Sequence, residues 1–474
     1  KAEYEANQLL NNSRTVTTVL EDGVAKKATT YVIPVVYHIL HMYGNENIAD
    51  SDIYDLMEEL NEDYSAANSG LSAIIPMFDT IVADMGIEFR LAAIDPYGNC
   101  TNGIEHIYTH ETNMGESVSK INQWDRSHYL NIWVVAEPNS GGPVQGVLLG
   151  YATFPAGTDG SGFWTDGIVL RDYTTANTET LTHEAGHYFG LPHPFNGVAQ
   201  VGGAGECGDD GILDTPPTEG SFSTCNLNLP TCDTSLVGND TLANVQNWMD
   251  YSSCAAMFTE GQKSVTHNTL QGISGQRNVL WQDTTLIETG VLNATMPQTA
   301  LTVPLCTPVA DFHSPDRTVC TGSPVTFEDA SWNAVIDTRA WTFEGGTPAT
   351  SASANPVVTF DTPGYKQVTL TVTNATGSDT RTESHYIYVS PDWPDNYGAA
   401  SFNMESATAY GTGTDFFIIE NIEDNYGEFK VVSGNGYDGS KAFKLQTYKD
   451  VSMADNFTSE WFYNYRLGGS VDHL

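Results

Sequence analysis

Three histidines and a glutamate are spaced along residues 180–193 in a pattern that can bind a metal ion. The stretch reads TLTHEAGHYFGLPH and contains H-E-x-x-H-x-x-G-x-x-H, with its histidines at His183, His187 and His193. On a helix, His183 and His187 lie one turn apart, so both imidazoles can point at the same ion. Glu184 follows the first histidine and can reach a water on that ion without being a ligand.

Gly190 predicts where this helix ends. A residue without a Cβ atom adopts positive φ readily and reverses the chain, which lets His193 return as a third ligand. Three neutral imidazoles with one open position are typical of a catalytic zinc site rather than a structural one. A bare HExxH arises often by chance, whereas the extended pattern specifies five positions. A helix that merely carries surface histidines is therefore the weaker interpretation.

Strand-forming and helix-forming segments alternate before this motif. The apolar run YVIPVVYHIL at residues 31–40 predicts a first strand, and a helix capped by Asp50 or Ser51 follows it. The buried face of that helix is marked by Ile53, Leu56, Met57 and Leu60. Further strands are predicted at residues 87–92, 129–136, 150–155 and 167–172. This order predicts an α+β domain, a twisted mixed sheet backed by helices with the metal-binding helix beneath it.

The chain after the motif changes character twice. Residues 199–239 are rich in Gly, Pro, Asp and Thr and are expected to form loops, and residues 260–281 predict a last helix. From about residue 301, short β-branched segments separated by turns predict an all-β sandwich. The expected divisions are an N-terminal extension or prosegment remnant (1–28), the metal-binding domain (29–300), the sandwich (301–390) and an incomplete β module (391–474).

The charge of the chain limits its partners. Acidic residues number 59 against 19 basic ones, and the net charge is −40. This balance argues against nucleic acid or an anionic membrane as a partner. It suits a secreted protein in a salty or calcium-rich medium, where cations screen the self-repulsion; a role in solubility alone is equally compatible. No apolar run is long enough to span a bilayer, and a chain that starts at Lys1 is expected to be a processed product.

Seven cysteines favour an oxidising compartment. None of them belongs to a CxxC pair, so a cysteine zinc site is not expected, and disulfides are the better interpretation.

Segments around the motif resemble a metzincin metallopeptidase of the pappalysin family. The second mark of this clan is a Met-containing turn below the metal, which NWMDYSSCAAMFTEGQ matches with Met249. The segments CGDDGILDTPP, IPVVYHIL and LGYATFP also resemble the family, especially its bacterial, cytophagalysin-type members. The resemblance covers about residues 31–281 and implies a secreted zinc endopeptidase that cleaves extracellular proteins.

The resemblance implies roles for individual residues. His183, His187 and His193 match the zinc ligands of the family, and Met249 matches the apolar floor under the metal. Glu184 matches the general base that takes a proton from the attacking water and passes it to the leaving amine.

Substrate contacts are implied on both sides of the metal. Residues 149–155 correspond to the strand on which an extended peptide adds as a further strand. Contacts to the peptide are expected from Leu149, Gly150, Tyr151 and Ala152. Tyr251 matches a tyrosine that can stabilise the oxyanion, with a packed core tyrosine as the alternative. Family members often prefer Arg after the scissile bond, but Ser252 and Ser253 leave no acid at that place, so a neutral or apolar residue is expected instead.

Disulfides are expected in two regions. The resemblance implies two bonds that fix a long loop to the Met-turn, Cys207–Cys232 and Cys225–Cys254. Cys306 and Cys320 bracket the start of the sandwich and are expected to pair there. Cys100 would then remain as a partly buried free thiol.

A second metal is expected in the acidic loop at residues 206–219. This loop reads ECGDDGILDTPPTE, its oxygen donors suit Ca²⁺, and the family carries calcium in this neighbourhood. The expected ligands are Asp209, Asp210, Asp214, Thr215 and Glu219. A solvated acidic loop is the alternative, because the spacing is not that of an EF-hand.

The sandwich resembles a PKD domain through PVADF, WTFEGG and PGYKQVTLTVTN. The resemblance implies a spacer or a contact to matrix or polysaccharide, without catalysis. The last segment resembles the beginning of a jelly-roll module. Two alternatives stay open: an adhesion or polysaccharide-binding protein with an accessory peptidase domain, and a latent enzyme in which residues 1–28 cross the cleft.

Overall fold

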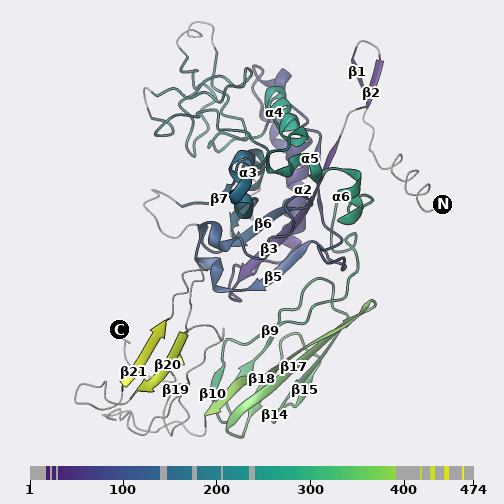
Figure 1. Cartoon of the computed structure of the whole chain (residues 1–474), viewed down its shortest axis with the longest axis vertical. Coiled ribbons are helices and arrows are strands. Elements are labelled where there is room, and N and C mark those ends of the chain that lie inside the picture. The colour runs from purple at the N-terminus through teal and green to yellow at the C-terminus, as the bar shows by residue number, and fades with distance from the viewer. Residues whose placement is uncertain are drawn as a thin grey trace, which may run out of the picture. The chain divides into compact units, whose positions relative to one another are not determined.

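The computed structural model divides the chain into two compact units (Figure 1). It describes residues 18–21, 24–27, 30–138, 147–172, 179–203, 206–233 and 241–390, and the short strands 417–418, 427–432, 442–447 and 462–463. The first unit comprises Lys1–Asp311, Ala330–Thr338 and Thr371–Thr380, and the second comprises Phe312–Asp329, Arg339–Leu370 and Arg381–Leu474. No helix in the described part of the chain is long and apolar enough to cross a membrane.

A mixed six-stranded sheet forms the centre of the first unit (Figure 1). Its order is β4-β3-β6-β8-β7, and β5 also pairs with β3. The strands are β3 (Tyr31–His41), β4 (Ile87–Leu91), β5 (Ile104–Tyr108), β6 (Leu130–Val135), β7 (Gly150–Ala152) and β8 (Ile168–Arg171). These pairings are parallel except that of β7 with β8. The expected mixed sheet is therefore confirmed.

Helices cover one face of this sheet. Helix α2 (Asp50–Tyr64) and helix α3 (Glu179–Tyr188) pack their apolar side chains against β3, β6 and β8 in one buried cluster. Trp124, Tyr129 and Trp133 cover the opposite face. Because both faces are buried, the central strands are continuous apolar runs rather than alternating ones, which is what made them visible in the sequence.

The first unit contains shorter elements as well. The helices that follow the metal-binding region are α4 (Glu260–Gln271), α5 (Arg277–Leu280) and α6 (Asp283–Glu288). The 3₁₀-helices are η1 (Ser69–Ala73), η2 (Asp79–Ile81), η3 (His110–Asn113), η4 (Glu116–Ser119), η5 (Pro155–Thr158), η6 (Gly160–Thr165) and η8 (Ser274–Gln276). Strands β1 (Thr18–Glu21) and β2 (Val24–Lys27) pair with each other. The other residues of the 1–28 extension, which in the latent-enzyme alternative cross the cleft, lie outside the described part.

Two helix predictions were wrong in detail. Helix α2 begins at Asp50 itself, its N-cap residue is Ala49, and the Asp52 carboxylate accepts a hydrogen bond from the Ala49 N–H (3.3 Å). The single helix expected at residues 260–281 is broken, because α4 ends where Gly272 is extended (φ −81°, ψ 157°), and Gly275 and Gln276 then take left-handed φ values of 59° and 58°. The apolar pattern continued across this break, so periodicity alone did not reveal it.

Two side-chain amides close the outer edge of β4. Asn61 of α2 accepts a hydrogen bond from the Phe89 N–H (2.8 Å) and donates one to the Phe89 carbonyl (3.0 Å). Gln298 does the same at Leu91, with distances of 2.6 and 3.1 Å. These amides occupy backbone groups that would otherwise be available for pairing with another chain.

The second unit contains most of a β-sandwich, as expected. The strands are β9 (Phe312–His313), β10 (Thr318–Cys320), β11 (Pro324–Thr326), β12 (Glu328–Asp329), β13 (Thr338–Phe343), β14 (Gly346–Thr347), β15 (Thr350–Ser351), β16 (Val357–Phe360), β17 (Gly364–Asn374) and β18 (Gly377–Ser390). They form sheets of order β10-β18-β17-β13-β15, β11-β16-β14 and β12-β9. Phe312, Phe327, Trp341 and Phe360 are buried in the core.

The jelly-roll module expected at residues 391–474 lies mostly outside the described residues. The structure describes β19 (Phe417–Ile418), β20 (Gly427–Val432), β21 (Ala442–Thr447) and β22 (Phe462–Tyr463) there, with β19 paired to β22 and β20 to β21.

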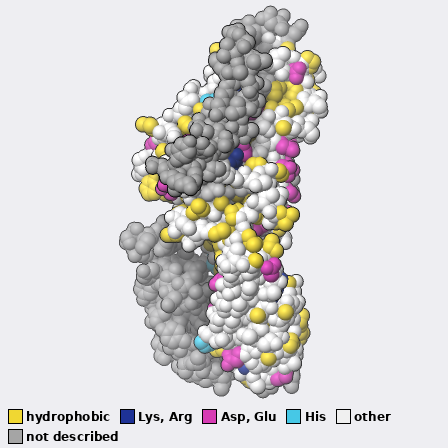
Figure 2. Space-filling view, turned by 90° about the vertical axis from the view of Figure 1, so that its right-hand side faces the viewer, with side chains coloured by type: hydrophobic (Ala, Val, Ile, Leu, Met, Phe, Trp, Pro, Cys, Tyr) yellow, Lys and Arg dark blue, Asp and Glu magenta, His cyan; other side chains and the backbone are white. Residues whose placement is uncertain are grey.

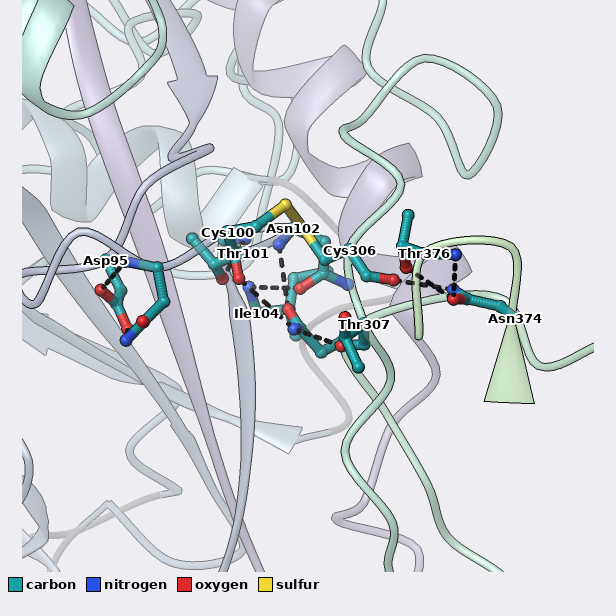
Figure 3. Close-up of a disulfide and its surroundings, with 12 residues drawn as sticks. Asp95, Cys100, Thr101, Asn102, Ile104, Cys306, Thr307, Asn374 and Thr376 are labelled. Carbon is teal, nitrogen blue, oxygen red and sulfur yellow. Dashed lines mark hydrogen bonds between the residues drawn. A yellow bond between two sulfur atoms is a disulfide. The ribbon is translucent and has the colours of Figure 1, made fainter. Parts of the chain in front are cut away.

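The prediction that Cys306 pairs with Cys320 was wrong, and so was the prediction of a free thiol at Cys100. Cys306 is bonded to Cys100 (Figure 3). Cys320 lies buried in β10. Beside this disulfide, the Asn374 amide donates to the Cys306 carbonyl (2.7 Å), and the Asn102 N–H donates to the Asn333 side chain (3.2 Å). Closeness in sequence favoured a local pair, whereas the fold brings Cys100 to Cys306 across 206 residues.

Replacing both Cys100 and Cys306 by Ser is expected to lower the free energy of unfolding by up to about 5 kcal/mol, because this disulfide restricts a very long loop in the unfolded chain. Urea-induced unfolding followed by tryptophan fluorescence measures the effect. Cys320→Ser, which leaves every disulfide intact, is the control. A loss below about 1 kcal/mol in the double variant would contradict the expectation.

Candidate active site

The three histidines of the motif converge on one point. His183 and His187 lie on α3 with their ring centroids 4.7 Å apart. The chain reverses at Gly190, whose φ is +89°, as its lack of a Cβ atom predicted. His193 then returns, so that its Nε2 atom lies 3.1 Å from His183 Nε2 and 2.9 Å from His187 Nε2. In the described part of the chain, this is the one group of three or more His, Cys, Asp or Glu side chains whose ligand atoms meet.

Backbone carbonyl groups orient two of these rings. His183 Nδ1 lies 2.8 Å from the Trp248 carbonyl oxygen, and His187 Nδ1 lies 2.7 Å from that of Leu191. A carbonyl oxygen only accepts, so each Nδ1 carries the hydrogen and each Nε2 keeps its lone pair for a metal. Burial lowers the pKa of His187 to about 4 and that of His193 to about 3, so both rings are neutral at neutral pH. Three neutral Nε2 atoms fit a zinc ion.

Glu184 lies beside this cluster and is buried. Burial raises the pKa of its carboxyl group to about 8, against the opposing effects of a hydrogen bond from the Ala152 N–H and the charge of Lys120. Its Oε2 atom is buried and has no hydrogen-bond partner in the structure. A buried carboxyl oxygen without a partner is costly, and at a metal site it is suited to exchange a proton with a bound water.

Met249 supports the metal-binding helix from below. Its side chain is fully buried, and a Cβ atom at Gly186 would lie only 2.3 Å from its sulfur. The glycine of the HEAGH segment therefore lets the Met-turn approach α3. The turn is fixed by Asn247, whose Oδ1 accepts hydrogen bonds from the Met249 N–H and from Gln262, both 2.9 Å long.

Tyr251 stands at the open side of the cluster. Its ring centroid lies 5.3 Å from that of His183 and 4.8 Å from that of His193, and the residue is 39% exposed, so it is not a packed core tyrosine. Burial of its phenol still raises the pKa to about 12, so the hydroxyl keeps its proton and can donate it in a hydrogen bond. The Asp250 carboxylate fixes the Tyr251 backbone by accepting its N–H (2.7 Å).

Strand β7 presents its outer edge to this site. Leu149 accepts a hydrogen bond from the Arg171 N–H of β8 (2.8 Å), and Thr153 donates one to Gly167 (3.4 Å). The backbone groups of the residues between them alternate in direction, so those of Gly150 and Ala152 point away from β8. The contact of the Ala152 N–H with Glu184 places this edge next to the histidines.

The two serines after Tyr251 differ in orientation. The Ser252 hydroxyl is buried and donates to the Val245 carbonyl, whereas Ser253 is exposed. The disulfide Cys225–Cys254 begins directly after them, and Cys207–Cys232 fixes the preceding loop. Both disulfides implied by the resemblance are present.

In the acidic loop at residues 206–219, some carboxylate oxygens accept hydrogen bonds within the protein and others do not. Asp214 accepts hydrogen bonds from Thr259 and from the Gly261 N–H (both 2.7 Å) and so fixes the start of α4. Asp210 accepts bonds from the Ile212 N–H and the Thr215 hydroxyl through Oδ1, while its Oδ2 atom is buried without a partner. Burial raises the pKa of Asp210 to about 6. The remaining predicted ligands, Asp209 and Glu219, do not join a cluster of acidic ligand atoms.

A buried ion pair, missed by the sequence analysis, joins the elements around the site. Both oxygens of Asp166 accept hydrogen bonds from Arg277, at 2.8 and 2.6 Å, and both side chains are almost fully buried. Arg277 also donates a hydrogen bond to the carbonyl of Tyr188, the last residue of α3. Its guanidinium carbon lies 3.5 Å from the centroid of the Tyr188 ring. Nothing in the spacing of these residues signals the pair, because they are 111 positions apart.

A second buried carboxyl group lies under α3. Asp63 of α2 accepts a hydrogen bond from the Thr182 hydroxyl (2.6 Å) and is 5% exposed. Burial raises the pKa of Asp63 to about 7.

Comparisons with known proteins find a peptidase family and the PKD domain. Residues 113–271 match the family model described as pregnancy-associated plasma protein-A, a peptidase family, and residues 306–389 match that of the PKD domain. An extracellular metalloprotease of Colletotrichum graminicola is 39% identical over 132 residues, which are 25% of this chain and 44% of that protein. One of Verticillium alfalfae is 26% identical over 266 residues, 53% of this chain and 79% of its own. The solved structure of mature mirolysin from Tannerella forsythia in complex with a cleaved peptide is 29% identical, with a TM-score of 0.48, and covers 55% of this chain and 98% of that one.

Replacing Asp63 by Asn is expected to stabilise the protein above about pH 7 and to have little effect near pH 4. The unfolded chain releases the Asp63 proton near pH 4, whereas the folded chain keeps it until about pH 7, so wild-type stability falls as the pH rises between these values. Asn cannot ionise, and its side-chain oxygen still accepts the Thr182 hydroxyl. Thermal unfolding at both pH values, with Glu58→Gln on the exposed side of α2 as the control, measures this. A stabilisation independent of pH would contradict it.

Proposed function

The chain carries a metalloprotease domain of the pappalysin family, followed by a PKD domain, and we propose that it is a secreted zinc endopeptidase that hydrolyses peptide bonds in extracellular proteins. The observation that carries this proposal is the meeting of three neutral Nε2 atoms beside the buried, unpartnered Oε2 atom of Glu184. The three disulfides are in keeping with secretion, because such bonds persist in oxidising compartments.

The site residues divide the reaction among them. His183, His187 and His193 hold the zinc ion, which when bound polarises the substrate carbonyl and makes a water acidic near neutral pH. Glu184 removes a proton from the attacking water and delivers it to the nitrogen of the leaving amine. The Tyr251 hydroxyl donates a hydrogen bond to the carbonyl oxygen as that oxygen gains negative charge, an effect of about 3 kcal/mol in comparable sites.

The substrate binds along β7 in an extended conformation. The outward backbone groups of Gly150 and the outward carbonyl of Ala152 pair with the backbone of the peptide, while the Ala152 N–H bonds to Glu184. Leu149 and Tyr151 flank them on the same strand. Main-chain pairing makes few demands on side chains, so selectivity arises at pockets. Ser253, with Ser252 behind it, favours a neutral or apolar residue after the scissile bond.

The surface charge and the second unit bear on the partners. On the face shown in Figure 2, Asp and Glu side chains are far more frequent than Lys and Arg side chains. This agrees with the net charge of −40 and with protein rather than nucleic-acid partners. The PKD domain serves as a contact to matrix or polysaccharide and takes no part in catalysis.

Calcium binding in the acidic loop also belongs to this proposal. The buried Asp210 Oδ2 atom without a partner is the observation that supports it, since a hard oxygen ligand of this kind suits Ca²⁺. Asp209, Thr215 and Glu219 supply further oxygen atoms nearby in the chain. Asp214 is the weakest of the expected ligands because both its oxygens already serve α4.

Replacing Glu184 by Ala is expected to reduce caseinolytic activity by a factor of about 10²–10⁴ without loss of zinc, because the residue moves protons and does not bind the metal. Initial rates and the zinc content of purified protein measure the two effects. Glu179→Ala, in the first turn of the same helix, is the control and should retain activity. Unchanged activity of Glu184→Ala would reject the proposal, and tight polysaccharide binding by a wild type that hydrolyses nothing would favour the adhesion alternative.

Removing calcium with a selective chelator is expected to lower the unfolding temperature of the wild type, because bound Ca²⁺ stabilises the folded state by mass action. Asp210→Asn should weaken this response. Differential scanning calorimetry with added Ca²⁺, and with Mg²⁺ as the control, provides the measurement. Equal responses to both ions, or an undiminished Ca²⁺ response in the variant, would contradict a calcium site at Asp210.

A further inference from the structure

Lys120 is a buried lysine on the side of the sheet opposite α3. It directly follows η4 and is only 7% exposed. Its Nζ atom donates hydrogen bonds to the carbonyl oxygens of Thr165 (2.5 Å) and Gly167 (3.1 Å) and to the Thr153 hydroxyl (3.3 Å). An ammonium group has three N–H bonds, so these three acceptors use all of them.

Two aromatic rings complete the surroundings of this ammonium group. Nζ lies 5.0 Å from the ring centroid of Tyr151 and 5.6 Å from that of Trp133. Tyr151 belongs to β7 and Trp133 to β6, and both side chains join the small cluster on the face away from α3. Ring faces attract a cation at these distances, so Lys120 also holds the Tyr151 side chain.

The three acceptors share a position relative to β7. Thr153 is the residue after β7 ends. Thr165 and Gly167 lie three residues and one residue before β8, the strand to which β7 is paired. The Thr153 hydroxyl in turn donates to the Thr165 carbonyl (2.6 Å). The ammonium group therefore fastens both ends of the connection 153–167 at the point where β7 leaves the sheet.

Other cations hold this connection through different residues. Arg126 donates to the Thr158 carbonyl (2.8 Å), and Arg277 binds Asp166. Neither contact involves a residue of β7 or Thr153, the residue that follows it. Of these three cations, Lys120 is the one that contacts both the end of the strand and a side chain within it.

A buried lysine is a costly way to fill space. Taking an ammonium group out of water disfavours folding unless its hydrogen bonds are all made, and a methionine of similar length would avoid that cost. A single group with three donors can, however, join two backbone carbonyls and a hydroxyl from separate segments. The geometry thus suits alignment of these segments better than it suits packing.

We propose that Lys120 is a positioning residue for the substrate: from behind the sheet it fixes the register of β7, so that Gly150 and Ala152 present their outward backbone groups to an extended peptide. This inference rests on the proposed function, because it concerns the strand on which that substrate binds. Lys120 touches neither the peptide nor the metal. Its charge also acts on Glu184, but its hydrogen bonds act on the substrate only through β7 and the connection 153–167.

Lys120→Met tests the proposal with two peptide substrates. One peptide has several residues before the scissile bond and pairs along β7, and the other has a single blocked residue there and does not. The variant is expected to raise KM for the long peptide by about tenfold, which corresponds to about 1.4 kcal/mol of binding, with a smaller change in kcat. KM for the short peptide should stay near its wild-type value, and Lys120→Arg, which keeps the charge, should recover most of the loss for the long one.

A role in folding alone predicts a different pattern, namely an equal fall in kcat for both peptides with both KM values unchanged. That pattern would overturn the proposal. Lys366→Met is the matched control, because Lys366 is equally buried, in β17 of the second unit, and its Nζ donates to Thr362 (2.9 Å). It should change KM for neither peptide.

Two further measurements keep the outcome clear. If Lys120→Met does not fold, Thr153→Val removes one acceptor and keeps the lysine, and it should raise KM for the long peptide alone by a smaller factor; an unchanged KM there would overturn the proposal. A wild type that hydrolyses neither peptide would contradict the proposed function. A wild type that hydrolyses both, alongside a Lys120→Met variant with wild-type KM for the long peptide, would overturn only the role of Lys120.

Discussion

The buried contact between Asp166 and Arg277 joins the parts that must stay in register for the site to exist. Asp166 lies two residues before the start of β8, and Arg277 donates a hydrogen bond to the carbonyl of Tyr188, the last residue of α3. A buried pair of this kind adds little net stability compared with apolar packing, but losing one partner leaves a charge without compensation, at about 3–5 kcal/mol. It therefore acts as a constraint on arrangement. The metal-binding helix cannot shift relative to the sheet edge without breaking it.

The local parts of the site could be predicted from the sequence, because their geometry follows from spacing along the chain. The helical turn between His183 and His187, and the reversal at Gly190, need only the preferences of a helix and of a residue without Cβ. The position of Met249 under the metal was expected only through family resemblance. Its close approach to Gly186 was not expected at all, since the two residues are far apart in the chain.

The long-range parts could not be predicted in this way. Cys100 and Cys306 have no pattern that links them, and neighbouring cysteines suggested a different pair. Lys120 looks like any surface lysine until the fold places three acceptors around it. The break after α4 was hidden because apolar spacing continued through it, while the backbone conformation of Gln276 is set by tertiary contacts rather than by its own preference.

The two edges of the central sheet are treated in opposite ways. Side-chain amides from Asn61 and Gln298 seal the edge at β4, while β7 keeps an outward edge beside Glu184. An open edge is a hazard for a protein at high concentration, because a second molecule can add to it and begin an aggregate. At β7, on the proposed mechanism, any added strand lies across the hydrolytic groups. A chain that pairs with β7 is hydrolysed and its fragments are released. The exposed edge therefore does not hold a second molecule for long.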